Sequence, residues 1–177
     1  RQWTLNAYFD QFSFPWLRYQ VNSPSDGYEV LGQVTWTPSR TVQLYGKVRR
    51  QVKQVNSSEV VSGVAPLVLV DQVNYRFNAS YKVSNGVTMR TRVETVNFRQ
   101  GDDPVQHGFL IYDDLIHRPL HGRVEFTGRV AVYSTDSYDA RIYAFESDLP
   151  GVYSLPPIYG TGILWYAMIR YTPARHI

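Results

Sequence analysis

Residues 74–94 alternate between apolar and polar side chains, and this alternation constrains the fold more than any other feature of the chain. Side chains at successive strand positions point to opposite faces, so each half of the stretch has one apolar face and one cationic face. Ser84, Asn85 and Gly86 separate the two halves and are residue types that tolerate the positive φ of a tight turn. The stretch therefore predicts a β-hairpin whose turn places Gly86 at positive φ.

The same alternation recurs along most of the sequence. It predicts strands over residues 3–9, 28–37, 42–50, 107–113, 123–133, 138–146 and 162–171 in addition to the hairpin. Long connections are expected over 11–27 and 148–160, a loop over 56–71, and a turn over 114–122. No segment keeps an apolar stripe at helical spacing for three turns. We therefore expect an all-β fold, an antiparallel up-and-down meander of about 8–10 strands in a closed or nearly closed barrel.

Length and composition limit the domain organisation and the chemistry. The 177 residues suit a single β-barrel domain spanning 1–177, which we expect to be a processed product or a fragment of a longer chain. There is no cysteine, which excludes disulfides and thiolate metal sites. The net charge of +3 is spread along the strands, whereas nucleic-acid surfaces more often carry a basic cluster.

Alternation alone does not decide which face of the sheet looks inward. In a soluble barrel the apolar face lines the core, whereas in an outer-membrane barrel it meets lipid and the polar face lines the lumen. Several strands approach the roughly 9 to 11 residues that cross a bilayer. Their apolar faces end in aromatic residues such as Tyr28, Trp36, Tyr75 and Tyr81, as in interfacial girdles. These features favour the membrane orientation, although the long connection 148–160 falls on the side where a short turn is expected.

The opposite faces of the strands mix both signs of charge with amides, as expected of a polar lumen whose charges are paired. We expect Glu94, Glu125 and Glu146 to pair with Arg92, Arg129 or Arg141. The residues that we predict to line a lumen or face a ligand are Glu29, Lys47, Arg49, Arg76, Arg90, Arg92, Glu94, Glu125, Arg129 and Arg141.

Three segments also resemble one group of bacterial proteins. Residues 24–29 read PSDGYE, residues 138–148 read YDARIYAFESD, and residues 159–173 read YGTGILWYAMIRYTP. These motifs are similar to those of the C-terminal β-barrel regions of Bacteroidota envelope proteins, some of which carry a helix-hairpin-helix segment. The resemblance covers most of the chain and implies an outer-membrane-type barrel fragment. Its motifs have no known catalytic role.

Candidate catalytic and metal-binding residues are few. His117 and His121 are four residues apart but have no third ligand at useful spacing, so we interpret them as exposed turn residues. The Asp pairs at 102–103 and 113–114 lack the spaced oxygens of a calcium loop and are interpreted as turn caps. The three glutamates named above are expected in ion pairs rather than as a glycosidase pair. We expect no enzyme activity, metal or cofactor.

Three functional interpretations remain open. The first is a bacterial outer-membrane barrel that acts as a pore, a plugged barrel or a membrane anchor, with the lipid bilayer and a small lumenal solute as partners. The second is a secreted or periplasmic lipocalin-like barrel that binds a small apolar ligand, with Tyr8, Tyr45 and Tyr143 on its surface. The third, which we favour least, is a nucleic-acid-binding module that stacks bases on Trp16, Tyr19 or Trp36. The sequence does not define the oligomeric state.

Overall fold

The computed structural model describes residues 2–19, 21–57, 65–148 and 151–173. Its elements are all strands, and no described helix is long and apolar enough to cross a membrane. The strands of the main sheet are β1 (Trp3–Phe14), β2 (Ser25–Trp36), β3 (Val42–Asn56), β4 (Leu67–Ser84), β5 (Val87–Gln100), β6 (Gln106–His117), β7 (Val124–Thr135) and β10 (Thr161–Tyr171). Two short strands, β8 (Ile142–Tyr143) and β9 (Pro157–Ile158), pair with each other.

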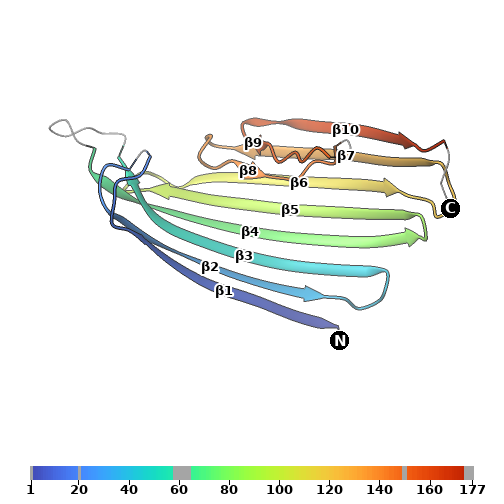
Figure 1. The fold of residues 1–177 in the computed structure, drawn as a ribbon, viewed down its shortest axis with the longest axis horizontal. Coiled ribbons are helices and arrows are strands. Elements are labelled where there is room, and N and C mark those ends of the chain that lie inside the picture. The colour runs from blue at the N-terminus through green and yellow to red at the C-terminus, as the bar shows by residue number, and fades with distance from the viewer. Residues whose placement is uncertain (1, 20, 58–64, 149–150, 174–177) are drawn as a thin grey trace.

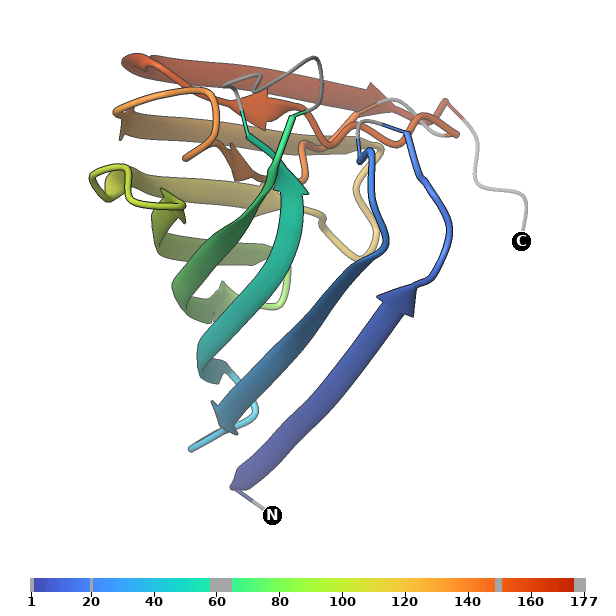
Figure 2. The same cartoon turned by 90° about the vertical axis from the view of Figure 1, so that its left-hand side faces the viewer.

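The eight long strands form one antiparallel sheet in the order β1-β2-β3-β4-β5-β6-β7-β10 (Figure 1). This order confirms the predicted all-β up-and-down meander. The sheet curves around a concave face and is open, with β1 and β10 at its two edges (Figure 2). Within the described residues β1 pairs only with β2, and β10 pairs only with β7, so the predicted closure into a barrel is absent from this structure.

Period-two alternation decides which side chains face outward. Along β6 and β7, buried and exposed positions alternate almost without interruption. The buried positions belong to the concave face, where Leu110, Tyr112 and Arg129 lie under a covering segment, and the exposed positions, such as Val130 and Val132, belong to the convex face. The face assignments expected from the sequence for β2, β3, β4, β5 and β7 agree with this arrangement.

Several strand boundaries differ from the prediction. β1 continues to Phe14, β4 begins at Leu67 inside the predicted loop over 56–71, and β6 continues to His117 through the predicted turn. Residues 58–64 of that loop lie outside the described residues. The strands extend because the backbone pairs of neighbours continue, as from Lys53↔Val70 to Asn56↔Leu67, although the side chains no longer alternate there.

The predicted strand over 138–146 is wrong. Of these residues only Ile142 and Tyr143 are in strand conformation. Residues 136–160 connect β7 to β10, and their described parts, 136–148 and 151–160, run along the concave side of β5 and β6 (Figures 1 and 2). Ala140, Ile142 and Ala144 are buried against the sheet, which explains their period-two pattern without a long strand. We call residues 136–160 the inner segment.

This correction restores a regular alternation of connections. One end of the sheet carries the connections 37–41, 85–86 and 118–123, and we call it the turn end. The other end, the loop end, carries 15–24, 57–66, 101–105 and the inner segment. Trp3 and Tyr171 both lie at the turn end (Figure 1). The connections at the loop end are longer than those at the turn end, except that 101–105 is as short as 37–41. The apparent exception at 148–160 came from counting residues 138–146 as a strand.

The predicted hairpin over 74–94 is confirmed, but the backbone conformation of its turn differs from the predicted one. Asn85 and Gly86 form a two-residue turn, yet the φ of Gly86 is not in the left-handed region. A Cβ at Gly86 would instead lie 3.2 Å from Pro119 Cα in the neighbouring β6–β7 turn. The Arg118 amide also donates to the Gly86 carbonyl at 2.7 Å. Close approach of two turns, rather than positive φ, accounts for this glycine.

Candidate functional site: a polar concave face behind an apolar convex face

The convex face exposes large apolar side chains along its whole width. On the two edge strands, Leu5 is 73% exposed and Trp165 is 74% exposed, and the central strands expose Val34, Phe77 and Val130. Soluble monomers rarely expose a contiguous apolar surface of more than a few hundred Å². Exposed apolar side chains thus extend from one edge strand of the convex face to the other.

Aromatic rings mark both borders of this apolar band. Trp3 and Trp36 are register partners near the turn end, and their ring centroids are 5.3 Å apart. Phe9 and Tyr28 stack at 6.2 Å nearer the loop end. Tyr28 and Trp36 are eight residues apart on β2, which corresponds to about 26 Å along a strand at roughly 3.3 Å per residue. A tilt of roughly 35 to 45° projects this length to about 18 to 21 Å, somewhat less than the roughly 25 Å apolar band of outer-membrane barrels.

Charged groups on the convex face are confined to two places in the central strands. Beyond the band, on the loop-end side, Arg50 and Asp71 form a bidentate ion pair at 3.0 and 2.8 Å, and the exposed Arg99 is the register partner of Asp71 on β5. Within the band, Asp113 is exposed and accepts a hydrogen bond from the Thr91 hydroxyl on β5. Asp113 and Asp114 were interpreted as turn caps. That interpretation is wrong because both lie in the extended β6.

The concave face carries three clusters of paired charges, the first centred on Glu29 of β2. Arg49, from the neighbouring strand β3, donates to this carboxylate with Nε at 2.8 Å and Nη2 at 2.5 Å. Gln51 Nε2 donates to it at 2.9 Å, and Tyr8 of β1 donates through its hydroxyl. Glu29 is 8% exposed, and its charge is satisfied by these donors.

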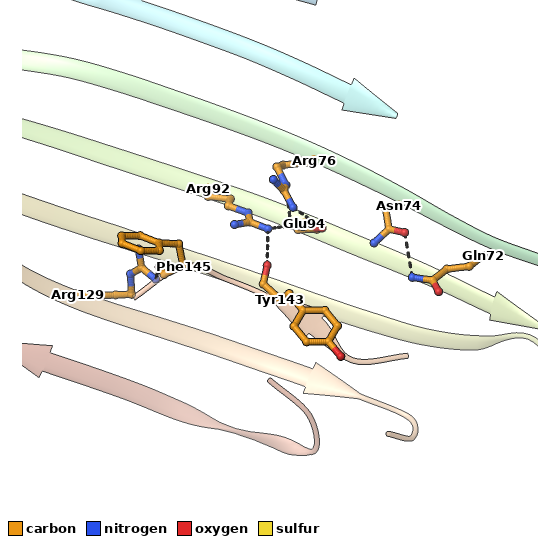
Figure 3. Close-up of polar contacts among 8 residues, drawn as sticks. All are labelled: Gln72, Asn74, Arg76, Arg92, Glu94, Arg129, Tyr143 and Phe145. Atoms are coloured by element: carbon orange, nitrogen blue, oxygen red, sulfur yellow. Dashed lines mark hydrogen bonds and ion pairs between the residues drawn. The ribbon is translucent and has the colours of Figure 1, made fainter. Parts of the chain in front are cut away.

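The second cluster is centred on Glu94 of β5, which is 2% exposed. Arg76 of β4 is its register partner and donates with Nε at 2.8 Å and Nη2 at 3.1 Å. Arg92, two residues away on β5, pairs with the same carboxylate and donates to the Tyr143 carbonyl of the inner segment at 3.0 Å (Figure 3). The predicted pairing of Glu94 with Arg92 is confirmed.

The third cluster joins β6, β7 and the inner segment. Arg129 donates to Asp114, its register partner, at 2.6 and 2.9 Å, and its Nη1 donates to the Phe145 carbonyl at 2.6 Å. Its guanidinium lies 3.7 Å from the ring centroid of Tyr112. The two arginines that bind carbonyls hold the inner segment against the sheet, and Figure 3 shows Arg92 and Arg129 beside Tyr143 and Phe145.

Other predicted residues lie apart from these clusters. Glu125 does not pair with Arg129; it lies 3.6 Å from Arg118 and from Arg170 near the turn end. Arg141 is in the inner segment, where it lies 3.7 Å from Asp139 and donates to the Tyr138 carbonyl, so its predicted place on a long strand and its pairing with Glu146 are wrong. Arg90 is exposed and, with Gln43, Tyr45, Asn78 and Ser80, lines a polar cavity of about 300 Å³.

Sequence reasoning missed Asp114, Tyr8 and Gln51 as members of these clusters. The alternation within 107–117 carries the signal for Asp114, since it falls on the same face as Leu110 and Tyr112. The assumed turn after residue 113 hid that signal. Which arginine each carboxylate meets depends on strand register, and the sequence does not specify register beyond the tight hairpin.

An apolar cluster lies on the concave face toward the loop end. Val96, Leu110 and Ala131 of the sheet pack with Ile142, Ala144 and Ile158 of the inner segment. Leu110 and Ala144 have no exposed surface. The inner segment is thus held by apolar contacts near the loop end and by arginine–carbonyl hydrogen bonds nearer the middle of the sheet.

The histidines and aspartates outside the clusters form no described metal site. Across the described ranges, which exclude residues 174–177, no three His, Asp or Glu side chains come together as ligands. His117 and His121 are exposed, and Asp102 and Asp103 lie in the β5–β6 connection.

No family model, no curated protein and no solved structure matches it. The architecture defines it as an antiparallel eight-stranded meander with a polar concave face and an apolar convex face.

Proposed function

We propose that the chain forms the wall of an outer-membrane-type β-barrel whose lumen is partly filled by the inner segment. The observation that carries the proposal is the distribution of exposure: the convex face exposes its largest apolar side chains, whereas Glu29, Arg92, Glu94 and Arg129 of the concave face are each at most 8% exposed. Lipid solvates the first face, and paired charges with lumenal water suit the second.

The ends of the sheet support the same orientation. Outer-membrane barrels have short periplasmic turns and longer extracellular loops. The connections at the turn end are short and those at the loop end are mostly longer, and β3 and β4 extend past the apolar band at the loop end. We therefore assign the turn end to the periplasm and the loop end to the exterior of a bacterial outer membrane.

The proposal also implies that the two open edges of the sheet are paired in the membrane. An unpaired strand edge leaves N–H and C=O groups without partners in hydrocarbon, which is too unfavourable to persist. In the membrane, β1 and β10 are therefore paired, and the sheet belongs to a closed barrel. Its arginine-anchored inner segment favours a plugged or narrowed lumen over a wide pore.

The lipocalin-like alternative has less support. It needs the apolar face inside the curve of the sheet to hold an apolar ligand. The concave face instead carries ion pairs and amides, and its apolar cluster is filled by the inner segment. The resemblance to barrel regions of Bacteroidota envelope proteins also favours the membrane proposal.

Cysteine labelling tests the orientation, because the chain has no cysteine of its own. Val34→Cys and Val132→Cys place thiols on the convex face, while Gln43→Cys and Ser80→Cys place them on the concave face outside the ion pairs. In vesicles, the first two should react with a lipid-phase maleimide and resist a charged one, and the second two should react with the charged reagent. Reaction of all four thiols with the charged reagent, with a monomeric protein in plain buffer, would rule out the membrane proposal.

A further inference from the structure

Lys47 and Arg76 are direct register partners on β3 and β4, and both are on the concave face. Like charges directly opposite each other on one face destabilise a sheet. Both side chains are only partly exposed, so water does not fully screen them. A negatively charged partner would stabilise such a like-charge pair on the concave face.

The carboxylates nearby are already shared among several cations. Lys47 lies within electrostatic range of three cations, Arg49, Arg76 and Arg92, and of one carboxylate, Glu94. Glu29 pairs with Arg49, and Glu94 pairs with both Arg76 and Arg92. Within the part of the chain that the structure describes, Lys47 forms no ion pair, so four cations share two carboxylates there.

Donor atoms remain available around Lys47. Arg49 and Arg76 each use Nε and Nη2 for their carboxylate, so Nη1 of each takes no part in those ion pairs, while Tyr8 and Tyr45 also interact with the two guanidinium groups. Lys47, Arg49, Arg76, Asn74 and Glu94 line a cavity of about 60 Å³. This space exceeds the roughly 10 to 15 Å³ that one water needs, so it admits a small ligand.

We propose that this cavity binds a small oxyanion, a phosphate or a carboxylate, through the Lys47 ammonium and the Nη1 groups of Arg49 and Arg76. Glu94 keeps its two arginines in place. If the membrane orientation also holds, the site lies in the lumen wall beside the part of the sheet that the inner segment covers. It then makes the passage of anions more favourable than that of cations.

The test uses the full chain purified in detergent, with inorganic phosphate, acetate and chloride compared at equal ionic strength. The wild type should bind phosphate or acetate in calorimetry and gain thermal stability relative to chloride. Lys47→Gln should lower the affinity at least tenfold. It should also raise the melting temperature in chloride, because it removes the like-charge pair.

Lys82→Gln is the matched control, since Lys82 is exposed near the turn end of β4 and should leave the affinity unchanged. Binding of phosphate alone assigns the site to phosphate groups, and equal binding of acetate extends it to carboxylates. The proposal fails if neither oxyanion binds better than chloride, or if Lys47→Gln binds as the wild type does. The assay needs no bilayer, so its result is independent of the cysteine-labelling result.

Discussion

Arg129 and Asp114 face each other directly across β7 and β6 and form a bidentate ion pair in which both side chains are less than a tenth exposed. The Phe145 carbonyl accepts a third hydrogen bond from the same guanidinium. The pair therefore joins two strands and the inner segment at one point. Removing either partner leaves a buried charge without compensation.

We expect Arg129→Leu to lower the free energy of unfolding by about 3 to 5 kcal/mol, because it leaves Asp114 unpaired. The double variant Arg129→Leu, Asp114→Leu should recover much of the loss. Urea unfolding in detergent measures both. Arg50→Leu is the control, since the Arg50–Asp71 pair is exposed and should contribute at most about 1 kcal/mol. Equal losses for Arg129→Leu and Arg50→Leu would contradict the buried pairing.

Gly86→Val should destabilise the fold by about 1 kcal/mol or more, because a side chain there meets the backbone of Pro119. Gly32→Ala and Gly46→Ala are controls in which a Cβ contacts nothing within 4 Å. These two should be neutral or slightly stabilising. Thermal unfolding of the three variants makes the comparison. A harmless Gly86→Val would mean that the two turns do not approach each other.

Val130→Arg tests the convex face. In the proposed orientation, an arginine near the bilayer midplane should make insertion less favourable by roughly 2 to 4 kcal/mol. Folding into lipid vesicles, followed by gel mobility with and without heating, measures the effect. Arg123→Leu, an exposed change just outside β7, should leave insertion unchanged. Insertion of Val130→Arg at the wild-type level would count against lipid contact at this strand.

We expect Asp113→Leu to change insertion in the opposite direction from Val130→Arg. The carboxylate is the one charge within the apolar band of the described central strands, and its partner is the Thr91 hydroxyl. Replacing it with leucine should improve insertion and raise the melting temperature in detergent, because no charge then enters the lipid-facing band. If insertion were lost instead, Asp113 would have to contact a group outside this chain rather than lipid.

Much of the fold is predictable from the sequence because alternation and turn residues act locally. The hairpin over 74–94 and the faces of β2, β3 and β7 are confirmed. The segment 138–146 misled the prediction because Ala140, Ile142 and Ala144 have strand periodicity but pack onto another sheet. Local pattern does not distinguish a strand that continues a sheet from one that lies across its face.

The polar clusters were less predictable because they depend on long-range register. Arg49 and Glu29 meet through the pairing of β2 with β3, and Arg76 meets Glu94 through the pairing of β4 with β5. The tight turn at Asn85 and Gly86 fixes only the second of these pairings from local sequence. Glu125 approaches Arg118 of the β6–β7 connection and Arg170 of β10 rather than Arg129 of its own strand, and only the three-dimensional arrangement decides this.

The position of the inner segment has a consequence for the order of folding. Strands β2 to β7 each pair with the strand before them across connections of at most about ten residues, so these contacts close short loops. β10 can pair with β7 only after the chain has closed the much longer loop of residues 136–160. Once β5 to β7 are paired, the hydrogen bonds from Arg92 and Arg129 to the Tyr143 and Phe145 carbonyls fix the middle of this loop. The chain then samples fewer conformations before β10 meets β7. The C-terminal edge of the sheet should therefore be the last part to gain protection in hydrogen exchange during refolding.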